Sequence, residues 1–271
     1  MKRKHLHLII GSTVIALVIA LAGMAAAQDA AEIMKKSHMA YYYAGDDGQV
    51  DVTMRLVSKS GKERIREFAM LRIDIEDGGD QKYYTYFKKP SDVSRLTFMV
   101  HKQLDGNDSR WIYVPAVDLV KPISADDKNS SFVGSNFSYE DVSGRHWNED
   151  NHTLVNGEGD LDGKGVFIIE SKPKDDGYKG FVRKLSYIDK ETYLPLKEEY
   201  FDKKDKLFRI FTAEKIEDVN GIKTVIVRKM ENVKKKTYTI VEFNNVKYDV
   251  GLDESLFTER YLKNPPRKYI N

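Results

Sequence analysis

The hydrophobic pattern changes its period along the chain. Apolar and small side chains follow helical spacing over residues 29–43, where Asp29 is a suitable N-cap. From residue 50 onward, apolar side chains alternate with polar ones, which predicts β-strands. Short turns rich in Gly, Asp and Asn separate these strands. About eleven strands are predicted, over residues 50–57, 63–77, 81–90, 95–102, 110–115, 165–173, 180–189, 193–202, 207–216, 222–231 and 236–248.

Two further segments complete the pattern. Residues 253–264 predict a terminal helix that Asp253 caps and that Pro265 and Pro266 end. Residues 116–163 keep neither period and are expected to be irregular. No Pro- or Ser-rich linker divides the chain, so residues 28–271 are predicted to form one domain.

The number of strands indicates the fold class. An antiparallel sheet of about eleven strands is expected to curl or close rather than remain flat. Several strands, such as "YYTYF" and "LTFMV", carry apolar side chains on both faces, whereas a sheet with one solvated face alternates cleanly. We therefore expect a mainly β (α+β) fold. It would be a single strongly curved antiparallel sheet, a half-barrel, with helices covering its concave face and spare apolar surface lining a cavity.

The N-terminus has the features of an export signal. Lys2, Arg3 and Lys4 precede an uncharged apolar run over residues 8–24, and three alanines follow at 25–27. This pattern predicts a secretory signal peptide over residues 1–27, cleaved after Ala27. Retention of the run as a membrane anchor is the alternative. The absence of cysteine excludes a lipid anchor on a cysteine.

Charge and cysteine content then indicate the compartment. Residues 1–27 carry three positive charges, so their removal takes the formal charge from +2 to −1. A near-neutral chain lacks the basic character that general nucleic-acid binding requires. A eukaryotic secreted protein would usually carry disulfides, but this chain has no Cys. We therefore expect a bacterial periplasmic protein.

Candidate nucleophiles and phosphate loops are weak in this sequence. No G-x-S-x-G elbow is present, and Ser135 in "VGSNF" is not preceded by a strand and followed by a helix. Lys164 lies in "GDLDGKG", which lacks the spacing of a phosphate-binding loop and predicts a hairpin turn. Neither segment predicts covalent catalysis.

Two other clusters could carry chemistry. His146 and His152 lie in "HWNEDNH" around two carboxylates, but their spacing fits no rigid metal site, and a solvated loop is the simpler interpretation. Glu140 and Asp141 lie beside aromatics and are the best candidates for the acid pair of a glycosidase, although adjacent carboxylates arise by chance in a chain with 42 Asp and Glu residues. No cofactor and no metal are predicted.

Three motifs resemble a known family. They are "FKKPSDVSRLTFMV" with Phe87 and Pro90, "RWIYVPAVDLVKPIS" with Trp111, Tyr113 and Pro115, and "SSFVGSNFSYEDV". Together with the order of the closing strands from residue 193 onward, they resemble the LolA-like outer-membrane lipoprotein-sorting family over most of residues 28–271. The resemblance is to a branch distant from LolA itself, and no arginine here is matched to the ligand-gating arginine of LolA.

The resemblance implies a half-barrel around a hydrophobic concavity and a non-enzymatic activity. Such a protein would bind the acyl chains of a lipid or lipoprotein and move it toward the outer membrane, with an RND/MMPL-type exporter as partner. Transient membrane contact and a monomeric state are expected with it. A periplasmic sensor or interaction module on the same fold is the alternative.

Candidate site residues follow from this interpretation. Strand parity suggests that six side chains line the lipid cavity: Phe68, Met70, Tyr84, Tyr86, Phe98 and Val100. The third motif supplies a lid or wall through Phe132, Gly134, Ser135, Asn136, Phe137, Tyr139, Glu140 and Asp141. Within it, Gly134 is expected in a tight turn and Ser135 or Asn136 as the cap of a short helix. Residues 29–43 and 124–150 are the candidates for moving lids.

Overall fold

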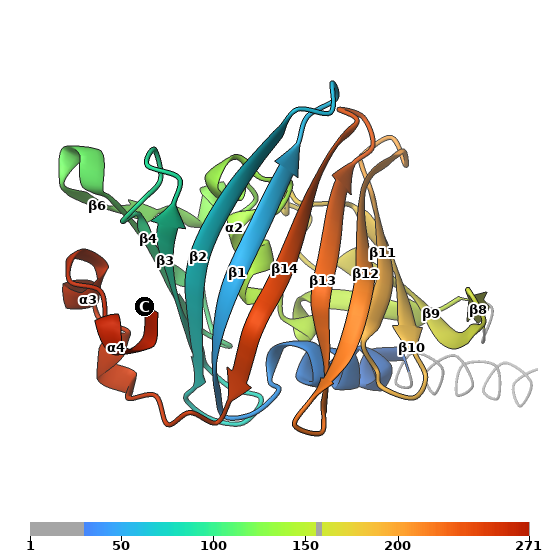
Figure 1. Ribbon diagram of the computed structural model, residues 1–271. Helices are drawn as coiled ribbons and strands as arrows, with labels where there is room; N and C mark the ends of the chain where they lie inside the picture. The colour runs from blue at the N-terminus through green and yellow to red at the C-terminus, as the bar shows by residue number, and fades with distance from the viewer. Residues whose placement is uncertain (1–29, 156–158, 271) are drawn as a thin grey trace, which may run out of the picture.

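The strands form one antiparallel sheet in a computed structural model that describes residues 30–155 and 159–270 (Figure 1). The predicted signal peptide over residues 1–27 lies outside these residues. The strands are β1 (Asp47–Val57), β2 (Glu63–Asp74), β3 (Gln81–Lys89), β4 (Thr97–Lys102), β5 (Ser109–Val114), β6 (Leu119–Ile123), β7 (Asp150–Leu154), β8 (Gly159–Leu161), β9 (Lys164–Pro173), β10 (Arg183–Asp189), β11 (Pro195–Phe201), β12 (Leu207–Val219), β13 (Ile222–Asn232) and β14 (Thr237–Tyr248).

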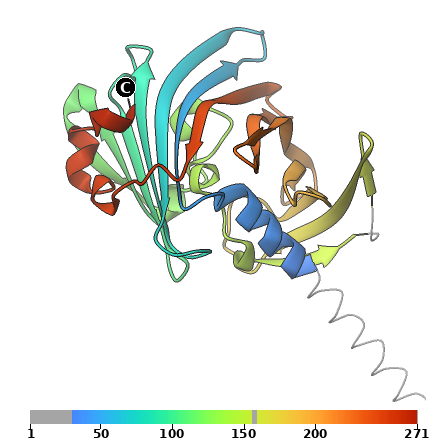
Figure 2. The same ribbon diagram turned by 60° about the horizontal axis from the view of Figure 1, so that its bottom comes forward.

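The sheet consists of two meanders joined at their first and last strands. Its order is β6-β5-β4-β3-β2-β1-β14-β13-β12-β11-β10-β9-β7, and β8 pairs with β9 beside this path. β1 pairs with β14, so Met54 lies opposite Val241. This pairing places the start and the end of the strand-forming region side by side at the centre of the sheet. The sheet curves into an open half-barrel, which Figure 2 shows from below.

The predicted fold class is confirmed, but the strand count is higher than expected. The fourteen strands include the eleven predicted ones and three short strands, β6, β7 and β8, within residues 116–163. β6 contains Pro122 and an exposed Leu119, and β7 has the sequence DNHTL. Strands of three to five residues with little apolar character give no detectable alternation, which is why the sequence pattern missed them.

Short helices cover both faces of the sheet. A helix over residues 30–42, here called the N-terminal helix, crosses the lower end of the concavity, and α2 (Tyr139–Ser143) lies inside the curve (Figures 1 and 2). α3 (Glu259–Lys263) and α4 (Arg267–Ile270) lie outside it. Five 3-10 turns accompany them, at Pro115–Val117, Ala125–Asp127, Phe132–Gly134, Trp147–Glu149 and Glu254–Leu256. Within the described ranges, no helix combines the length and apolarity needed to span a bilayer.

The C-terminal segment corrects two expectations. The predicted helix over 253–264 is split into a 3-10 turn and α3, and α4 follows the prolines. Asp253 does cap the first turn, because its carboxylate accepts the N–H of Ser255 at 2.8 Å. The segment covers the outer face rather than the concave face, with Phe257 and Leu262 fully buried against Tyr84 and Met99. This packing explains why the strands over 63–113 carry apolar side chains on both faces.

Candidate functional site

The concave face carries the larger apolar cluster of the protein. Strand parity brings Phe68, Met70, Phe98 and Val100 to this face, as expected. Tyr84 and Tyr86 correct the expectation: they point to the outer face, and the Tyr84 hydroxyl donates to the carbonyl of Tyr261 at 2.8 Å.

The physical reason for this correction is the strand register. Met70 is paired with Thr85, so Thr85 rather than Tyr84 shares the concave face with Met70. Within one strand, Tyr84 and Tyr86 lie on the opposite parity from Tyr83, Thr85 and Phe87. Tyr83 and Phe87 belong to the concave cluster. The strand is aromatic on both sides, so parity alone did not indicate which aromatics face inward.

Aromatic side chains of the third motif occupy one side of the concavity. The Phe132 ring lies 5.3 Å from that of Phe98, 5.7 Å from that of Tyr139 and 5.9 Å from that of Phe87. These separations are typical of packed aromatic pairs. The motif therefore fills space over β3 and β4 that would otherwise be open, as a plug formed by the protein's own side chains.

The backbone of the motif is a tight turn followed by a capped helix. Gly134 has φ +76° and the preceding Val133 has φ +46°, so two consecutive residues adopt left-handed geometry. The cap of α2 is Ser138, not Ser135 or Asn136 as expected. Its Oγ accepts the N–H of Asp141 at 3.2 Å, and the Asp141 carboxylate accepts the N–H of Ser138 at 2.6 Å. This reciprocal pair is a capping box, whose spacing of three residues is visible in "SYED".

Asn136 attaches the motif to the centre of the sheet instead. Its backbone N–H donates to the Thr239 hydroxyl at 3.0 Å, and its side-chain amide donates to the carbonyl of Thr237 at 2.9 Å. The Thr239 hydroxyl returns a hydrogen bond to the side-chain Oδ1 of Asn136 at 3.2 Å. These three bonds attach the motif to β14, which lies about a hundred positions further along the chain and joins the two meanders.

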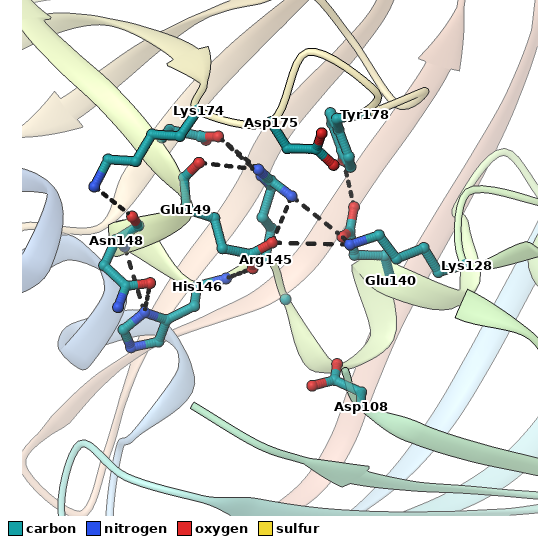
Figure 3. Close-up of polar contacts among 12 residues, drawn as sticks. Asp108, Lys128, Glu140, Arg145, His146, Asn148, Glu149, Lys174, Asp175 and Tyr178 are labelled. Atoms are coloured by element: carbon teal, nitrogen blue, oxygen red, sulfur yellow. Dashed lines mark hydrogen bonds and ion pairs between the residues drawn. The ribbon is translucent and has the colours of Figure 1, made fainter. Parts of the chain in front are cut away.

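Glu140 lies at the centre of a buried polar network (Figure 3). Its carboxylate accepts from Lys128 at 2.9 Å and from the hydroxyl of Tyr178, and Arg145 lies 3.7 Å away. Burial opposes its ionisation, but Lys128, Tyr178 and Arg145 together hold the pKa of Glu140 below its usual value. A carboxylate held ionised by these partners is a structural group, not a proton donor.

Arg145 extends this network across the segment. Its guanidinium contacts Glu149 at 2.6 Å and Asp150 at 2.9 Å, and it lies 3.9 Å from the Tyr178 ring centroid (Figure 3). Burial alone would lower the pKa of Arg145, but the carboxylates around it raise it. The carboxylates considered for metal binding or glycosidase chemistry are thus all bound by cations.

The histidines of "HWNEDNH" have structural partners too. His146 caps the turn at Trp147–Glu149 through its Nδ1, which accepts the N–H of Asn148 at 3.3 Å. His152 Nε2 lies 2.7 Å from the carbonyl of Trp147, and its Nδ1 lies 2.8 Å from the hydroxyl of Ser171. In the part of the chain that the structure describes, no group of three or more His, Asp or Glu is placed to hold a metal ion.

The N-terminal helix closes the lower end of the concavity. The Arg72 guanidinium on β2 donates to the carbonyls of Tyr42, Ala44 and Gly45, at 2.7 Å for Ala44 and 2.6 Å for Gly45. Gln81 also donates to the Tyr42 carbonyl, at 2.9 Å. These donors satisfy carbonyls at the C-terminal end of the helix, which have no partner within it. Side-chain contacts of β2 and β3 therefore hold this end of the helix.

The helix also meets the 124–150 segment. The rings of His38 and His146 lie 4.9 Å apart, edge to face. The Tyr42 ring lies so close to Gly144 that an added Cβ there would come within 2.4 Å of it, so any side chain at 144 would displace the ring. The described residues of the two candidate lids, 30–43 and 124–150, are therefore packed against each other as well as against the sheet.

The N-terminal helix and residues 124–150 together cover the concavity and are here called the covers. Three small cavities lie beneath them. A cavity of about 80 Å³ is lined mainly by polar side chains, including His38, Asp141 and Glu198. A second, of about 110 Å³, has mainly apolar walls, and a third of about 30 Å³ lies between Phe68 and Phe132. Arg228 of β13 lines all three. Pockets for drug-sized ligands usually measure roughly 300–1,000 Å³, so these cavities are too small for a long acyl chain unless the covers move.

A larger groove lies at the upper rim, beside the third motif. Its volume is about 670 Å³, and it runs between the motif and the turns that follow β1 and β13. Four cations line it and no carboxylate does: Lys62, Arg64, Arg209 and Lys235. Arg209 is paired with Asp141 at 3.0 Å. The other three are exposed at the rim.

The inward-facing arginines were not among the sequence candidates. Arg72, Arg209 and Arg228 share their parity with apolar side chains of the concave cluster, namely Met70, Phe211 and Met230 respectively. A signal was available, because an arginine at an apolar parity in a predicted strand breaks the binary pattern. Its meaning depended on knowing which face of the sheet is concave.

Known proteins resemble this chain in sequence and in fold. A family model described as an uncharacterized protein matches residues 79–264. A crystal structure of a DUF1329 family protein from Desulfovibrio piger is 28% identical with a TM-score of 0.81, covering 88% of this chain and 99% of that chain. A putative outer membrane lipoprotein-sorting protein domain from Vibrio parahaemolyticus is 26% identical with the same TM-score and the same coverage. No curated protein matches the chain.

A more distant structure shares the fold alone. A LolA superfamily protein from Nitrosomonas europaea is 16% identical with a TM-score of 0.67, covering 86% of this chain and 98% of that chain. The predicted resemblance is therefore confirmed at the level of family and fold. The chain belongs to the family of uncharacterized proteins whose model spans residues 79–264, a family with the LolA-like fold of outer-membrane lipoprotein-sorting proteins but distant from LolA itself.

Proposed function

We propose that this protein is a non-enzymatic periplasmic carrier that binds the acyl chains of a lipid or lipoprotein on its concave face and moves the cargo toward the outer membrane. The observation that carries the proposal is the way the concavity is covered. Its floor combines an apolar cluster of strand side chains with inward-facing cations such as Arg228, and its covers are held by polar contacts such as those of Arg72 and Asn136. The related lipoprotein-sorting domain from Vibrio parahaemolyticus supports the same role.

The energetics of loading follow from the cavity sizes. Burying one methylene contributes about 0.8 kcal/mol, so a sixteen-carbon chain supplies on the order of 10 kcal/mol. The cavities of about 80 and 110 Å³ do not accommodate such a chain without displacement of Phe132 or of the N-terminal helix. We infer that the covers fill the concavity before loading and that the cargo replaces their apolar contacts. A carrier of this kind protects its own apolar surface when empty and releases cargo when the covers return.

Analysis of co-purifying lipid tests the carrier directly. Protein purified from the periplasm of its native host would be extracted with organic solvent, and the extract analysed by mass spectrometry. A lipid or lipoprotein species in stoichiometric amount is the expected result. The outer-face variant Phe257→Ala is the matched control, because it removes a buried aromatic outside the concavity. Absence of any acyl species, together with no binding of added fatty acids, would contradict the proposal.

Two finer statements belong to this proposal. An RND/MMPL-type exporter is the proposed inner-membrane partner, and the protein is proposed to act as a monomer. The cations of the rim groove, Lys62, Arg64 and Lys235, support transient contact with an anionic membrane surface during transfer. Crosslinking in intact cells from photoreactive residues placed at the rim would test the partner, and light scattering would test the oligomeric state.

A sensor or interaction module on the same fold is the second candidate. The observation that favours it is the plug, because a concavity filled by Phe132 and Tyr139 needs no ligand for stability. A sensor of a protein partner would bind no acyl chain, whereas a carrier would bind one and exchange it. The lipid analysis above separates the two.

A further inference from the structure

Arg228 occupies the centre of the concave face. It lies on β13, opposite Val241 of β14, and shares its parity with Met230. Both Val241 and Met230 belong to the concave apolar cluster. Because side chains alternate between the two faces of a strand, the guanidinium points into the concavity. Its contribution to the walls of three cavities agrees with this direction.

The surroundings of Arg228 are mostly aromatic. One terminal nitrogen donates to the Tyr41 hydroxyl at 2.8 Å. The guanidinium carbon lies 4.4 Å from the ring centroid of Phe243, 5.7 Å from that of Phe137 and 5.9 Å from that of Tyr41. Its Nε is buried and has no hydrogen-bond partner. Of five N–H donors on a guanidinium, a single one is thus engaged by an acceptor among the described residues.

Comparison with other arginines shows what is missing. The Nε atoms of Arg55, Arg110 and Arg209 are also buried without a partner, but each of these guanidiniums is paired with a carboxylate. The paired oxygens lie at 2.6 Å for Arg55, 2.5 Å for Arg110 and 3.0 Å for Arg209. Arg228 forms no ion pair with any carboxylate in residues 30–155 and 159–270. Its direct contacts are therefore ring faces and one hydroxyl, and the carboxylate of Asp141 favours its charge without an ion pair.

The carboxylates that share a cavity with Arg228 do not supply the missing anion. Four carboxylates line a cavity with Arg228, and each is bound by another cation. Asp141 is bound by Arg209 at 3.0 Å and Glu198 by Lys184 at 2.7 Å. Glu140 is bound by Lys128 and Asp150 by Arg145, both at 2.9 Å. Buried cations are usually paired, because transfer of an unpaired charge from water into a protein costs several kcal/mol. Arg228 is thus a cation without an ion pair of its own in the place where the proposed cargo would lie.

We propose that Arg228 binds the anionic group, carboxylate or phosphate, of an acyl ligand. This inference rests on the proposed carrier function and adds the chemical class of the ligand. The planar guanidinium offers parallel donors that match the oxygens of such a group. The adjoining cavity of about 110 Å³ has apolar walls that include Val50, Met70 and Phe243, which suit the first methylenes of the chain. Movement of the covers would open space for the rest of the acyl chain.

Matched ligands isolate the role of the charge. Dodecanoate, dodecyl phosphate and dodecanol have the same chain and differ in the head group, and their affinities for the full mature chain would be measured by calorimetry. An anionic ligand is expected to bind about 10- to 100-fold more tightly than the alcohol, which is the range for a charge-assisted hydrogen bond. A comparison of the affinities for dodecanoate and dodecyl phosphate then shows which of the two anionic groups is preferred. Acetate and inorganic phosphate should bind far more weakly than either.

Variants assign the preference to one residue. Arg228→Leu should bind dodecanol as the wild type does and lose the preference for the anion, and Arg228→Lys should retain part of it. Arg55→Leu is the matched control, because Arg55 is paired with Glu242 on the outer face. If Arg228→Leu does not fold, the wild type still decides: ¹³C-carboxyl dodecanoate bound near Arg228 should titrate at a lower pH than in solution.

The outcomes separate this inference from the carrier proposal. Equal binding of acid, phosphate and alcohol by the wild type would overturn the role of Arg228 and leave the carrier intact. A preference that persists in a folded Arg228→Leu variant would also overturn it, as would tight binding of acetate or inorganic phosphate alone. Failure of all three twelve-carbon ligands to bind would count against the carrier itself.

Discussion

The guanidinium of Arg209 holds the carboxylate of Asp141 through two parallel hydrogen bonds, each 3.0 Å long. Asp141 is also the residue that closes the capping box of α2 with Ser138. One carboxylate therefore caps the short helix within the concavity and fastens it to β12. The Tyr200 ring, 4.2 Å from the guanidinium, supports Arg209 from the other side.

Replacement of Asp141 should loosen the third motif. Asp141→Asn leaves Arg209 without its anion and weakens the cap, and we expect a loss of about 2–4 kcal/mol in the free energy of unfolding, since the pair is largely buried. Urea denaturation would measure it. The control is Glu67→Gln, whose exposed pair with Lys89 should contribute less than about 1 kcal/mol. Equal effects of the two changes would show that Asp141 does not fasten the segment.

The contact between His38 and His146 predicts a dependence on pH. Burial, with Lys102 and His146 nearby, holds the pKa of His38 well below its usual value, and burial also lowers the pKa of His146. The unfolded chain therefore binds protons more readily than the folded one. The stability from these neutral rings is complete above about pH 6.5 and decreases as the pH falls below that value toward the folded pKa values.

Local hydrogen exchange would measure this effect. The amides of the N-terminal helix should exchange faster at pH 5 than at pH 7, after correction for the intrinsic rate, because protonated His38 and His146 repel each other and Lys102. His38→Phe should flatten the dependence. His101→Gln is the control, since His101 has a lowered pKa but bonds to the Phe257 carbonyl on the outer face. The same flattening in both variants would refute a local origin.

Arg72 should control how readily the lower end of the concavity opens. Arg72→Gln removes the donors to the Ala44 and Gly45 carbonyls, so the end of the N-terminal helix should detach more often. In stopped-flow measurements, we expect a fluorescent fatty acid to be taken up roughly 10-fold faster. This rate corresponds to a decrease of about 1.4 kcal/mol in the free energy needed to detach the end of the helix. Arg64→Gln, at the opposite rim, should leave the uptake rate unchanged. An unchanged rate in Arg72→Gln would place the entrance elsewhere.

The two apolar faces should respond differently to loss of an aromatic ring. Phe132→Ala and Phe257→Ala each remove a buried ring, and each should cost about 3–5 kcal/mol of stability. The first change enlarges the cavity next to Phe68, whereas the second acts under α3. Calorimetry with dodecanol should therefore show tighter binding for Phe132→Ala alone. Weaker binding by that variant would mean that the ring contacts the cargo rather than filling its place.

The cations of the rim groove should govern membrane contact. Changing Lys62, Arg64 and Lys235 to Gln should lower partitioning onto phosphatidylglycerol vesicles by roughly 100-fold at low salt, at about 1 kcal/mol per cation. Binding to phosphatidylcholine vesicles should be weak for both proteins.

A triple change with the same charge serves as the control. Lys164, Lys223 and Lys247 are exposed and do not line the groove, and their replacement by Gln alters the net charge equally. If this variant loses as much binding as the groove variant, net charge rather than the groove is responsible.

Local pattern predicted the strands well and the covers poorly. The alternation of Val52, Met54 and Leu56 with polar residues was read correctly as one buried face. The three strands of the middle segment were missed because each has five residues or fewer. The cap of α2 was misplaced to Ser135 or Asn136, although "SYED" contains the Ser-x-x-Asp spacing of a capping box. Its true cap depended on where the chain turns at Gly134, which the sheet fixes through Asn136.

The sequence by itself determined which segments extend, where Asp253 starts a turn and which positions along each strand share a face. These properties depend on neighbours within a few residues, so they can be read from periodicity and capping chemistry. Tertiary structure alone decided which face became the inside. Arg228 meets the hydroxyl of Tyr41 across 187 positions, and Tyr84 turns outward because residues 252–270 return to cover it. Contacts between segments so far apart arise from the closure of the whole sheet, so the local spacing of residues does not predict them.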